Sequence, residues 1–404
     1  MLFILTLCWP FPSRSQHYPR TGTKEITRVL APLTERWGAW LQEQDTYAFQ
    51  LIYTQIDRDA NNRPTLYHYS WNLDTNRYFL PASFVKLPVA ALALEEIQAI
   101  REEDRNYALN SFSPMRVAVG RKDDCQTPTT PTEASEILGY PSVAHNVKAA
   151  LVGSDNTGYD RLFEFLGQCE INRRLRAKGY TTATIISRYG KRCSKTEDLF
   201  ANPVQFFLGD SVIHALPARR CAEIFYHRRS KNAPNGYPDS PRGTYISLWD
   251  AHQMLLAVML PQAMPAHKRF HLSGYQYKLL RKYLGMYAAE SYDPVFPKKY
   301  TQPVTALKFL FYGGGLEPPR DSLRVFNKVG FTRNFVTDVA YVVDFENDIE
   351  FALSATLFLP GKNATQRAKP FFRDLGQAFY SQETTRWRLF RPELDYLKFN
   401  YTVY

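Results

Sequence analysis

Three short strings, far apart along the chain, place the strongest limits on how it can fold. They are Ser83-Phe84-Val85-Lys86, Ser154-Asp155-Asn156 and Lys328-Val329-Gly330, in this order. Chance alone supplies about one S-x-x-K string in a chain of this length, and Ser-Asp-Asn in roughly one such chain in fifteen to twenty. Lys-Val-Gly is weaker still, because Lys before a strand bulge is common. The combination is informative, since a fold that uses all three strings must bring a helix start, a loop and a strand together.

The first string has the spacing of a nucleophile and its base. Ser83 and Lys86 are three residues apart, so in a helical turn both side chains lie on one face. A serine hydroxyl is a poor nucleophile and needs a base within reach. Lys86 accepts a proton only when it is neutral, and burial together with a second cation such as Lys328 lowers its pKa in that direction. A helix N-terminus at Ser83 also offers backbone N–H groups to negative charge. The pattern predicts a serine acyl-enzyme.

Length and composition indicate a globular chain with a full core. The sequence has 404 residues, of which 45% are hydrophobic. No flexible linker, low-complexity block or repeat divides it, so we predict a single catalytic domain over residues 16–404. The net charge of +11 suits an anionic partner such as nucleic acid, a membrane surface or a cell-wall polymer. Lys and Arg occur only in short clusters without a nucleic-acid motif, which favours a solvated surface and no nucleic-acid partner. Oligomeric state stays open.

The N-terminus is typical of an export signal. Residues 1–9 form an apolar run that is too short to span a bilayer but has the length of a signal-peptide core. We expect a signal peptide over residues 1–15, export to the periplasm or the medium, and no integral membrane span. The alternative is a short buried N-terminal strand. Lipidation of Cys8 is not expected, because Leu7 stands where a small residue would be needed.

The cysteines are compatible with disulfides. After removal of the leader four remain, namely Cys125, Cys169, Cys193 and Cys221. An even number suits an oxidising compartment, and three fully paired connectivities are possible. Ordinary buried thiols are the alternative. No pair has the C-x-x-C spacing of a zinc site, so we expect no metal and no cofactor.

Periodicity and composition predict strands at both ends of the chain and helices between them. Residues 45–57 and 65–80 are rich in β-branched and aromatic types and predict a hairpin. A helix is expected from Pro81 to Ile97, with the first string in its opening turn. The further expected elements are helices at 142–152, 157–177 and 248–260, an irregular excursion at 180–245, strands at 323–329, 337–344 and 349–359, and a closing amphipathic helix at 370–380.

From Asp45 to Tyr380 the chain resembles the class A β-lactamase and penicillin-binding-protein family of serine hydrolases, whose motifs are S-x-x-K, S-D-N and K-T-G. The resemblance implies an α+β fold with an antiparallel sheet flanked by helices, from about residues 40–100 and 305–385. It also implies an all-helical lobe over about residues 101–300, with the site in the cleft between the two lobes.

The resemblance assigns catalytic roles to three residues. Ser83 would be the acylated nucleophile, and Lys86 would accept its proton directly or through water. Ser154 would pass a proton to the leaving amine.

Four further residues would bind the substrate by the same resemblance. Asn156 would orient the substrate amide, and Lys328 would attract the substrate carboxylate. Gly330 would leave room beside the strand edge. The backbone N–H of Phe331, together with that of Ser83, would form the oxyanion hole.

Two departures from the family pattern bear on turnover. Val329 replaces the Thr or Ser whose hydroxyl helps Lys hold the carboxylate. The family also uses a loop Glu, followed four residues later by Asn, to activate the deacylating water. Asp198 and Asn202 have that spacing but the wrong acid, whereas Glu197 is the right acid one residue out of register. The alternative for both acids is a solvated loop carboxylate. Without a positioned base the acyl-enzyme would accumulate.

The sequence therefore favours a serine hydrolase that acts on a β-lactam or a peptidoglycan-type peptide. A β-lactamase-like protein with weakened catalysis that binds cell-wall fragments is the main alternative. A nucleic-acid-binding protein is a third, weaker hypothesis, which salt-dependent binding to DNA would support. The true substrate and the role of residues 203–245 are left open.

Overall fold

The computed structural model of the chain describes residues 18–77, 79–118, 139–190, 193–225 and 243–401. The expected signal peptide, Cys8 and Cys125 lie outside the described residues. The strands are β1 (Arg20–Thr21), β2 (Gln50–Arg58), β3 (Pro64–Trp71), β4 (Met115–Val117), β5 (Phe200–Ala201), β6 (Val204–Leu208), β7 (Ser211–Leu216), β8 (Arg219–Arg220), β9 (Leu323–Phe331), β10 (Phe335–Asp344) and β11 (Ile349–Phe358).

The α-helices are α1 (Lys24–Leu30), α2 (Thr34–Gln42), α3 (Gln44–Tyr47), α4 (Lys86–Glu103), α5 (Val143–Val152), α6 (Asn156–Leu166), α7 (Gln168–Ala177), α8 (Leu248–Met259), α9 (Gly274–Gly285), α10 (Lys298–Thr301) and α11 (Ala364–Thr385). A 3-10 turn, η2 (Ala82–Val85), leads directly into α4. Among the described residues, no helix combines the length and the hydropathy that a bilayer crossing requires.

A six-stranded sheet lies at the centre of the fold, with strand order β1-β3-β2-β11-β10-β9. Only β1 pairs in parallel, with β3, and the other pairs are antiparallel. The predicted meander at the C-terminal end is the run β9-β10-β11, whose strands are rich in β-branched and aromatic residues. Strand β9 lies at the edge of this sheet. The α+β class predicted from the sequence is confirmed.

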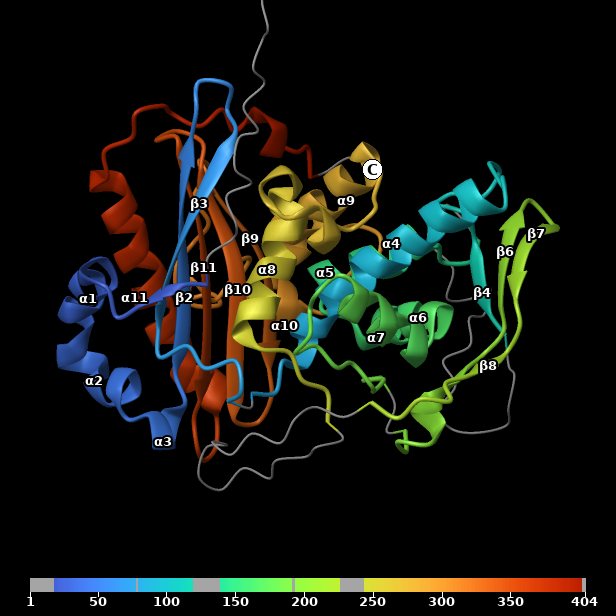
Figure 1. Ribbon diagram of the computed structural model, residues 1–404, viewed down its shortest axis with the longest axis horizontal. Coiled ribbons are helices and arrows are strands. Elements are labelled where there is room, and N and C mark those ends of the chain that lie inside the picture. Colours follow the sequence, from blue (N-terminus) through green and yellow to red (C-terminus); the bar gives the residue numbers. More distant parts are fainter. Residues whose placement is uncertain (1–17, 78, 119–138, 191–192, 226–242, 402–404) are drawn as a thin grey trace, which may run out of the picture.

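Helices cover both faces of the sheet (Figure 1). On one face α1, α2 and α11 bury an apolar cluster that includes Trp37, Phe351 and Phe371. On the other face α8 and α9 pack against the sheet, and α4 to α7 extend the layer away from it. Because side chains alternate along a strand, neighbouring residues of β9 belong to opposite faces. The register places Lys328 opposite Val339, and Val339 opposite Ser354, on the helical-lobe side.

Side-chain caps fix where the helices next to the site begin. The Ser142 side chain accepts the N–H of His145 at the start of α5, and the Asp155 side chain accepts the N–H of Gly158 at the start of α6. The single helix expected over 157–177 is instead two helices, α6 and α7, separated at Gly167. The φ angle of Gly167 is +79°, a conformation that favours glycine.

The helical lobe also carries β-structure in the stretch that the sequence predicted to be irregular. Strands β6 and β7 form a hairpin, and β4 pairs with β6 in a three-stranded sheet at the far end of α4 (Figure 1). The short strands β5 and β8 pair below it. The lobe is therefore mainly helical rather than all-helical, because residues 200–220 pair with one another and with 115–117.

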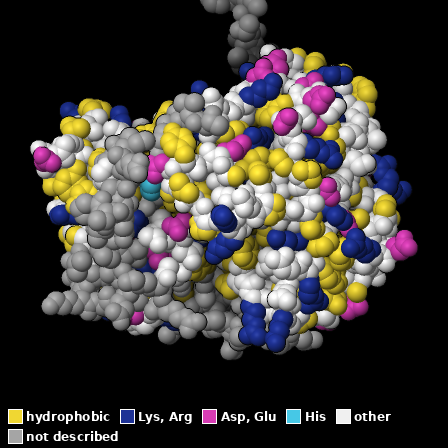
Figure 2. Space-filling view, turned by 180° about the vertical axis from the view of Figure 1, so that it is seen from behind, with side chains coloured by type: hydrophobic (Ala, Val, Ile, Leu, Met, Phe, Trp, Pro, Cys, Tyr) yellow, Lys and Arg dark blue, Asp and Glu magenta, His cyan; other side chains and the backbone are white. Residues whose placement is uncertain are grey.

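The surface charge is dispersed. Figure 2 shows Lys and Arg side chains scattered over one face of the molecule, with Asp and Glu among them. This distribution matches the expectation of a solvated surface on that face.

A buried polar chain crosses the sheet beneath α8. The Thr54 hydroxyl lies 2.7 Å from His68 Nδ1 and 2.6 Å from His252 Nε2, and His252 Nδ1 lies 2.7 Å from the Ser354 hydroxyl. Burial lowers the pKa of His68 to about 4 and that of His252 well below its usual range. Both rings are therefore neutral in the folded protein at physiological pH.

The His68 ring should make stability fall in acid. The unfolded chain takes up its proton near pH 6.5, whereas the folded chain takes it up only near pH 4. The contribution of His68 is therefore fully present above pH 6.5 and is lost as the pH falls toward 4, at about 1.4 kcal/mol per pH unit. We expect His68→Gln to reduce the pH dependence of the free energy of unfolding between pH 4 and pH 6.5 by the contribution of one proton. Urea unfolding at several pH values in this range measures it. An unchanged slope in the variant would contradict the assignment.

Candidate active site

The turn that carries Ser83 is a strained entry to α4. Ser83 lies in η2, and Lys86 is the first residue of α4, so the predicted pair spans the junction of a 3-10 turn and an α-helix. Ala82, directly before Ser83, is buried at φ +47°, a conformation that costs free energy for a residue with a Cβ. The N–H of Phe84 donates to the Pro81 carbonyl at 3.0 Å and holds the turn. Backbone strain here is concentrated next to the predicted nucleophile.

Lys86 is surrounded by acceptors at the end of its side chain. Its Nζ lies 3.1 Å from Ser83 Oγ, 2.5 Å from the Ser154 carbonyl, 2.7 Å from Asn156 Oδ1 and 3.4 Å from Ser154 Oγ. Burial lowers the pKa of Lys86 to about 7, although Asp155 and Asp160 act in the opposite direction. Two hydrogens of the amine serve the two carbonyl oxygens. In the neutral form the lone pair is therefore available to the Ser83 hydroxyl.

Ser154 joins the two lysines. It lies in the loop between α5 and α6 at φ +54°, and this unusual conformation accompanies the sharp turn between the two helices. Lys328 Nζ donates to Ser154 Oγ at 3.0 Å and to the Val329 carbonyl at 3.0 Å. Complete burial, followed by the nearby charge of Lys86, holds the pKa of Lys328 well below its usual value. The structure thus brings together five predicted residues from three segments that are distant in sequence, namely Ser83, Lys86, Ser154, Asn156 and Lys328.

Gly330 and Phe331 lie on the edge strand β9 beside the turn. A Cβ at position 330 would stand 2.1 Å from the Pro81 carbonyl oxygen and 3.1 Å from the Phe84 nitrogen, so only glycine allows this approach. Phe331 is partly exposed, and its ring stacks on Phe309. The close contact between η2 and β9 fixes the position of the turn that carries Ser83 against the edge strand.

Val329 points away from the site. It is 1% exposed and belongs to the apolar cluster on the α11 side of the sheet, opposite the face of Lys328. The residue therefore contributes to the core on that face.

Two of the three residues proposed for deacylation, Asp198 and Asn202, are held in a buried network instead. Asp198 is 3% exposed and accepts from the backbone N–H and the guanidinium of Arg188, both at 3.1 Å. The Asn202 amide donates to Glu164 at 2.9 Å, and Glu164 also pairs with Arg188 at 2.7 Å. The interpretation of Asp198 as a solvated loop carboxylate is wrong, because the Arg188 guanidinium draws it into the protein interior.

Glu197 has a more peripheral position in the same segment. Its carboxylate accepts the N–H of Ser194 at 2.6 Å, and its backbone carbonyl accepts from Arg188 at 3.3 Å. These contacts organise the loop, whose two ends are Arg188 and Asp198.

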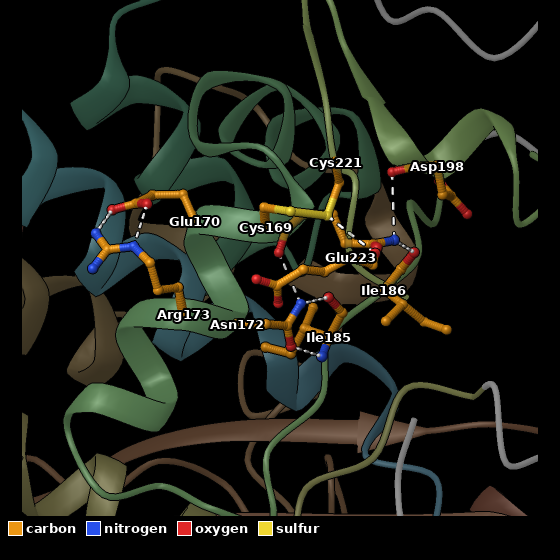
Figure 3. Close-up of a disulfide and its surroundings, with 10 residues drawn as sticks. Cys169, Glu170, Asn172, Arg173, Ile185, Ile186, Asp198, Cys221 and Glu223 are labelled. Atoms are coloured by element: carbon orange, nitrogen blue, oxygen red, sulfur yellow. Dashed lines mark hydrogen bonds and ion pairs between the residues drawn. A yellow bond between two sulfur atoms is a disulfide. The ribbon is translucent and has the colours of Figure 1, made fainter. Parts of the chain in front are cut away.

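A disulfide beside this loop joins α7 to the residue that follows β8. Cys169 is bonded to Cys221 (Figure 3). The backbone N–H of Cys221 donates to the Leu199 carbonyl at 2.8 Å. Gln168 Nε2 donates to the Ile186 carbonyl at 2.8 Å, on the chain that enters the loop. Cys193 is also disulfide-bonded. The alternative of ordinary buried thiols is therefore wrong for these three cysteines.

Sequence reasoning missed the residues that support Asn156. Asn156 Nδ2 donates to the Tyr189 carbonyl at 3.1 Å, and Asp160 accepts the backbone N–H groups of Tyr189 and Gly190. One signal was available, because Asp160 follows Asn156 by four residues and so shares its helix face. Nothing in the sequence indicated that residues 189–190 would meet that face.

The part of the chain that the structure describes contains no group of three or more His, Cys, Asp or Glu side chains that could hold a metal ion.

Comparison with known proteins supports a hydrolase. The model described as Beta-lactamase enzyme family matches residues 67–259, which include Ser83, Lys86, Ser154 and Asn156. The match confirms the family resemblance predicted from the sequence over these residues. No curated protein matches the chain.

Similar solved structures include a β-lactamase from Burkholderia phymatum, with 14% identity, a TM-score of 0.48 and coverage of 87% of this chain and 99% of that one. A β-lactamase from Sphaerobacter thermophilus has 12% identity, a TM-score of 0.45 and coverage of 82% and 91%. The structure titled PBP-A has 13% identity, a TM-score of 0.49 and coverage of 91% and 98%.

Removal of Arg188 should destabilise the loop and the lobe beneath it. Its side chain is 2% exposed and faces Glu164, which is fully buried, so Arg188→Met would leave an uncompensated buried carboxylate. We expect a loss of about 3–5 kcal/mol in the free energy of unfolding, measured in urea. Arg173→Met is the matched control, because that side chain is 66% exposed and pairs with Glu170 on the surface. The control should cost less than about 1 kcal/mol. Equal losses in both variants would contradict the role of Arg188.

Proposed function

We propose that the protein is a serine hydrolase that forms an acyl-enzyme at Ser83, with a β-lactam or a peptidoglycan-type peptide as substrate. The observation that carries the proposal is the 3.1 Å contact between Ser83 Oγ and a buried Lys86 whose pKa is about 7. A base with that pKa is half deprotonated at physiological pH and suits general-base catalysis.

In the proposed acylation, Ser83 Oγ attacks the substrate carbonyl while its proton moves to Lys86 Nζ. A bond forms between Oγ and the carbonyl carbon, and the tetrahedral intermediate then expels the amine nitrogen. Ser154 Oγ lies between the two lysine amines, gives its proton to that nitrogen and takes up the proton held by Lys86 Nζ. The C–N bond therefore breaks without leaving an amide anion, and Lys86 returns to its neutral form.

Substrate binding would use groups that flank the catalytic serines and lysines. Asn156 would orient the substrate amide, and Lys328 would attract its carboxylate. The N–H groups of Ser83 and Phe331 would hold the oxyanion, with Gly330 leaving room for the backbone of η2 beside them.

Deacylation is proposed to be slow. Asp198 and Asn202 are engaged with Arg188 and Glu164, and a base that is tied into an ion pair is a poor activator of water. This observation also favours the second candidate function, a β-lactamase-like protein with weakened catalysis that retains cell-wall fragments. We further propose that the protein is exported, because its disulfides suit an oxidising compartment.

Ser83→Ala should abolish covalent labelling. Intact-protein mass spectrometry after incubation with a penicillin should show an adduct on the unaltered protein and none on the variant. The decay of the adduct over time separates a hydrolase from a protein that binds without turnover. Absence of an adduct on the unaltered protein, with penicillins and with a broader set of activated esters and amides, would overturn the proposed function.

The acylation rate should increase as the pH rises through about 7. Lys86 serves as base only in its neutral form, and its population grows as the pH passes the pKa of this amine. The measurement is the second-order rate constant of acylation by a fluorescent penicillin across that interval, with stability checked at each pH. A rate that is flat or falls through this interval would contradict Lys86 as the base.

A further inference from the structure

Asp160 is a fully buried carboxylate next to the site that the proposed mechanism does not use. It lies on α6, four residues after Asn156. One oxygen accepts the backbone N–H of Tyr189 at 2.7 Å, and the other accepts the N–H of Gly190 at 2.8 Å. A carboxylate with both oxygens committed to successive backbone N–H groups holds that segment in one position.

Residues 189–190, which Asp160 holds, also contact Asn156 at the start of α6. The Tyr189 carbonyl accepts Asn156 Nδ2 at 3.1 Å, which leaves Asn156 Oδ1 facing Lys86 Nζ at 2.7 Å. A carbonyl requires the amide nitrogen on one side, and an amine donor requires the amide oxygen on the other. Both contacts therefore select the same orientation of the Asn156 side chain.

We propose that Asp160 is a positioning residue for Lys86, because it holds residues 189–190 against Asn156 and places a negative charge near the Lys86 amine. The consequence for catalysis rests on the proposed function of Ser83 and Lys86. The geometric and electrostatic parts of the proposal concern Lys86 itself and do not depend on the substrate.

Charges from several elements act on this pair. Asp155, Asp160 and Lys328 act on Lys86, while Arg188, Asp198 and Lys86 act on Asp160. Burial raises the pKa of Asp160 to about 6, and its two backbone hydrogen bonds oppose that rise. Asp160 is thus mainly ionised at neutral pH, where it favours the protonated form of Lys86. Loss of this charge should lower the pKa of Lys86.

Gly190 supplies an independent probe of the same contact. A Cβ at this position would stand 2.5 Å from Asp160 Oδ2, and the next atoms it would meet are Asp160 Cγ at 3.4 Å and the Asn156 carbonyl oxygen at 3.7 Å. Gly190→Ala would therefore push the segment away from Asp160 without changing any charge. In a chain that carries Asp160→Ala, most of this obstruction is absent.

The first experiment measures the Lys86 titration directly. NMR of the full chain with ¹³C-labelled lysine, with the Lys86 signal assigned by Lys86→Arg, gives the pKa in the unaltered protein and in Asp160→Asn. We expect a lower Lys86 pKa in the variant. Asp155→Asn is the comparison variant, and it should also lower the Lys86 pKa, because Asp155 acts on Lys86 as well. Asn also caps a helix, so this variant removes a charge without disturbing residues 189–190. An unchanged Lys86 pKa in Asp160→Asn would overturn the electrostatic part of the proposal.

The second experiment is a double-mutant cycle on acylation by a fluorescent penicillin. We expect Asp160→Ala and Gly190→Ala each to lower the second-order rate constant about tenfold or more, and the double variant to be no slower than Asp160→Ala alone. Urea unfolding of each variant separates this loss from a loss of folding. Additive losses, or unchanged rates, would overturn the positioning role. If the unaltered protein forms no adduct, the proposed function fails while the NMR titration still decides the role of Asp160.

Discussion

The burial of one amine organises the rest of the site. Lys86 is removed from water, and its Nζ is satisfied by the Ser154 carbonyl and Asn156 Oδ1. Burying an amine is costly unless such partners exist. The loop between α5 and α6 must therefore meet the start of α4, and this requirement fixes how the helical lobe sits on the sheet. The lowered pKa of Lys86 follows from the same burial.

The second amine of the site belongs to Lys328 on β9, and the pairing register of this strand sets its position. Lys328 faces the helical lobe because its strand partner is Val339, and a shift of one residue would turn the side chain toward the α11 face. The neighbouring Val329 faces the opposite cluster and anchors the strand in the core. The position of the Lys328 amine thus depends on the apolar packing of Val329 on the opposite face of the sheet.

Local patterns were sufficient to predict most of the elements but not their contacts. Strands β9, β10 and β11 were predicted within a few residues, because alternation and turn residues are local signals. The strands within residues 200–220 were missed, since their pairing partners include the distant β4. The acids at 197 and 198 were considered by spacing alone, and spacing cannot reveal that Arg188 binds one of them. The contact between Asp160 and residues 189–190 was hidden for the same reason, because it joins segments separated by a loop.

The edge position of β9 has a consequence for how the protein behaves among its own copies. An edge strand presents unpaired backbone groups, which invite pairing with strands of other molecules. Here the Leu307 carbonyl lies 3.1 Å from Asn327 Nδ2, and the Pro81 carbonyl abuts Gly330, so segments of the same chain flank the edge. An incoming strand would have to displace both. The arrangement discourages intermolecular sheet growth, and with it aggregation at high concentration.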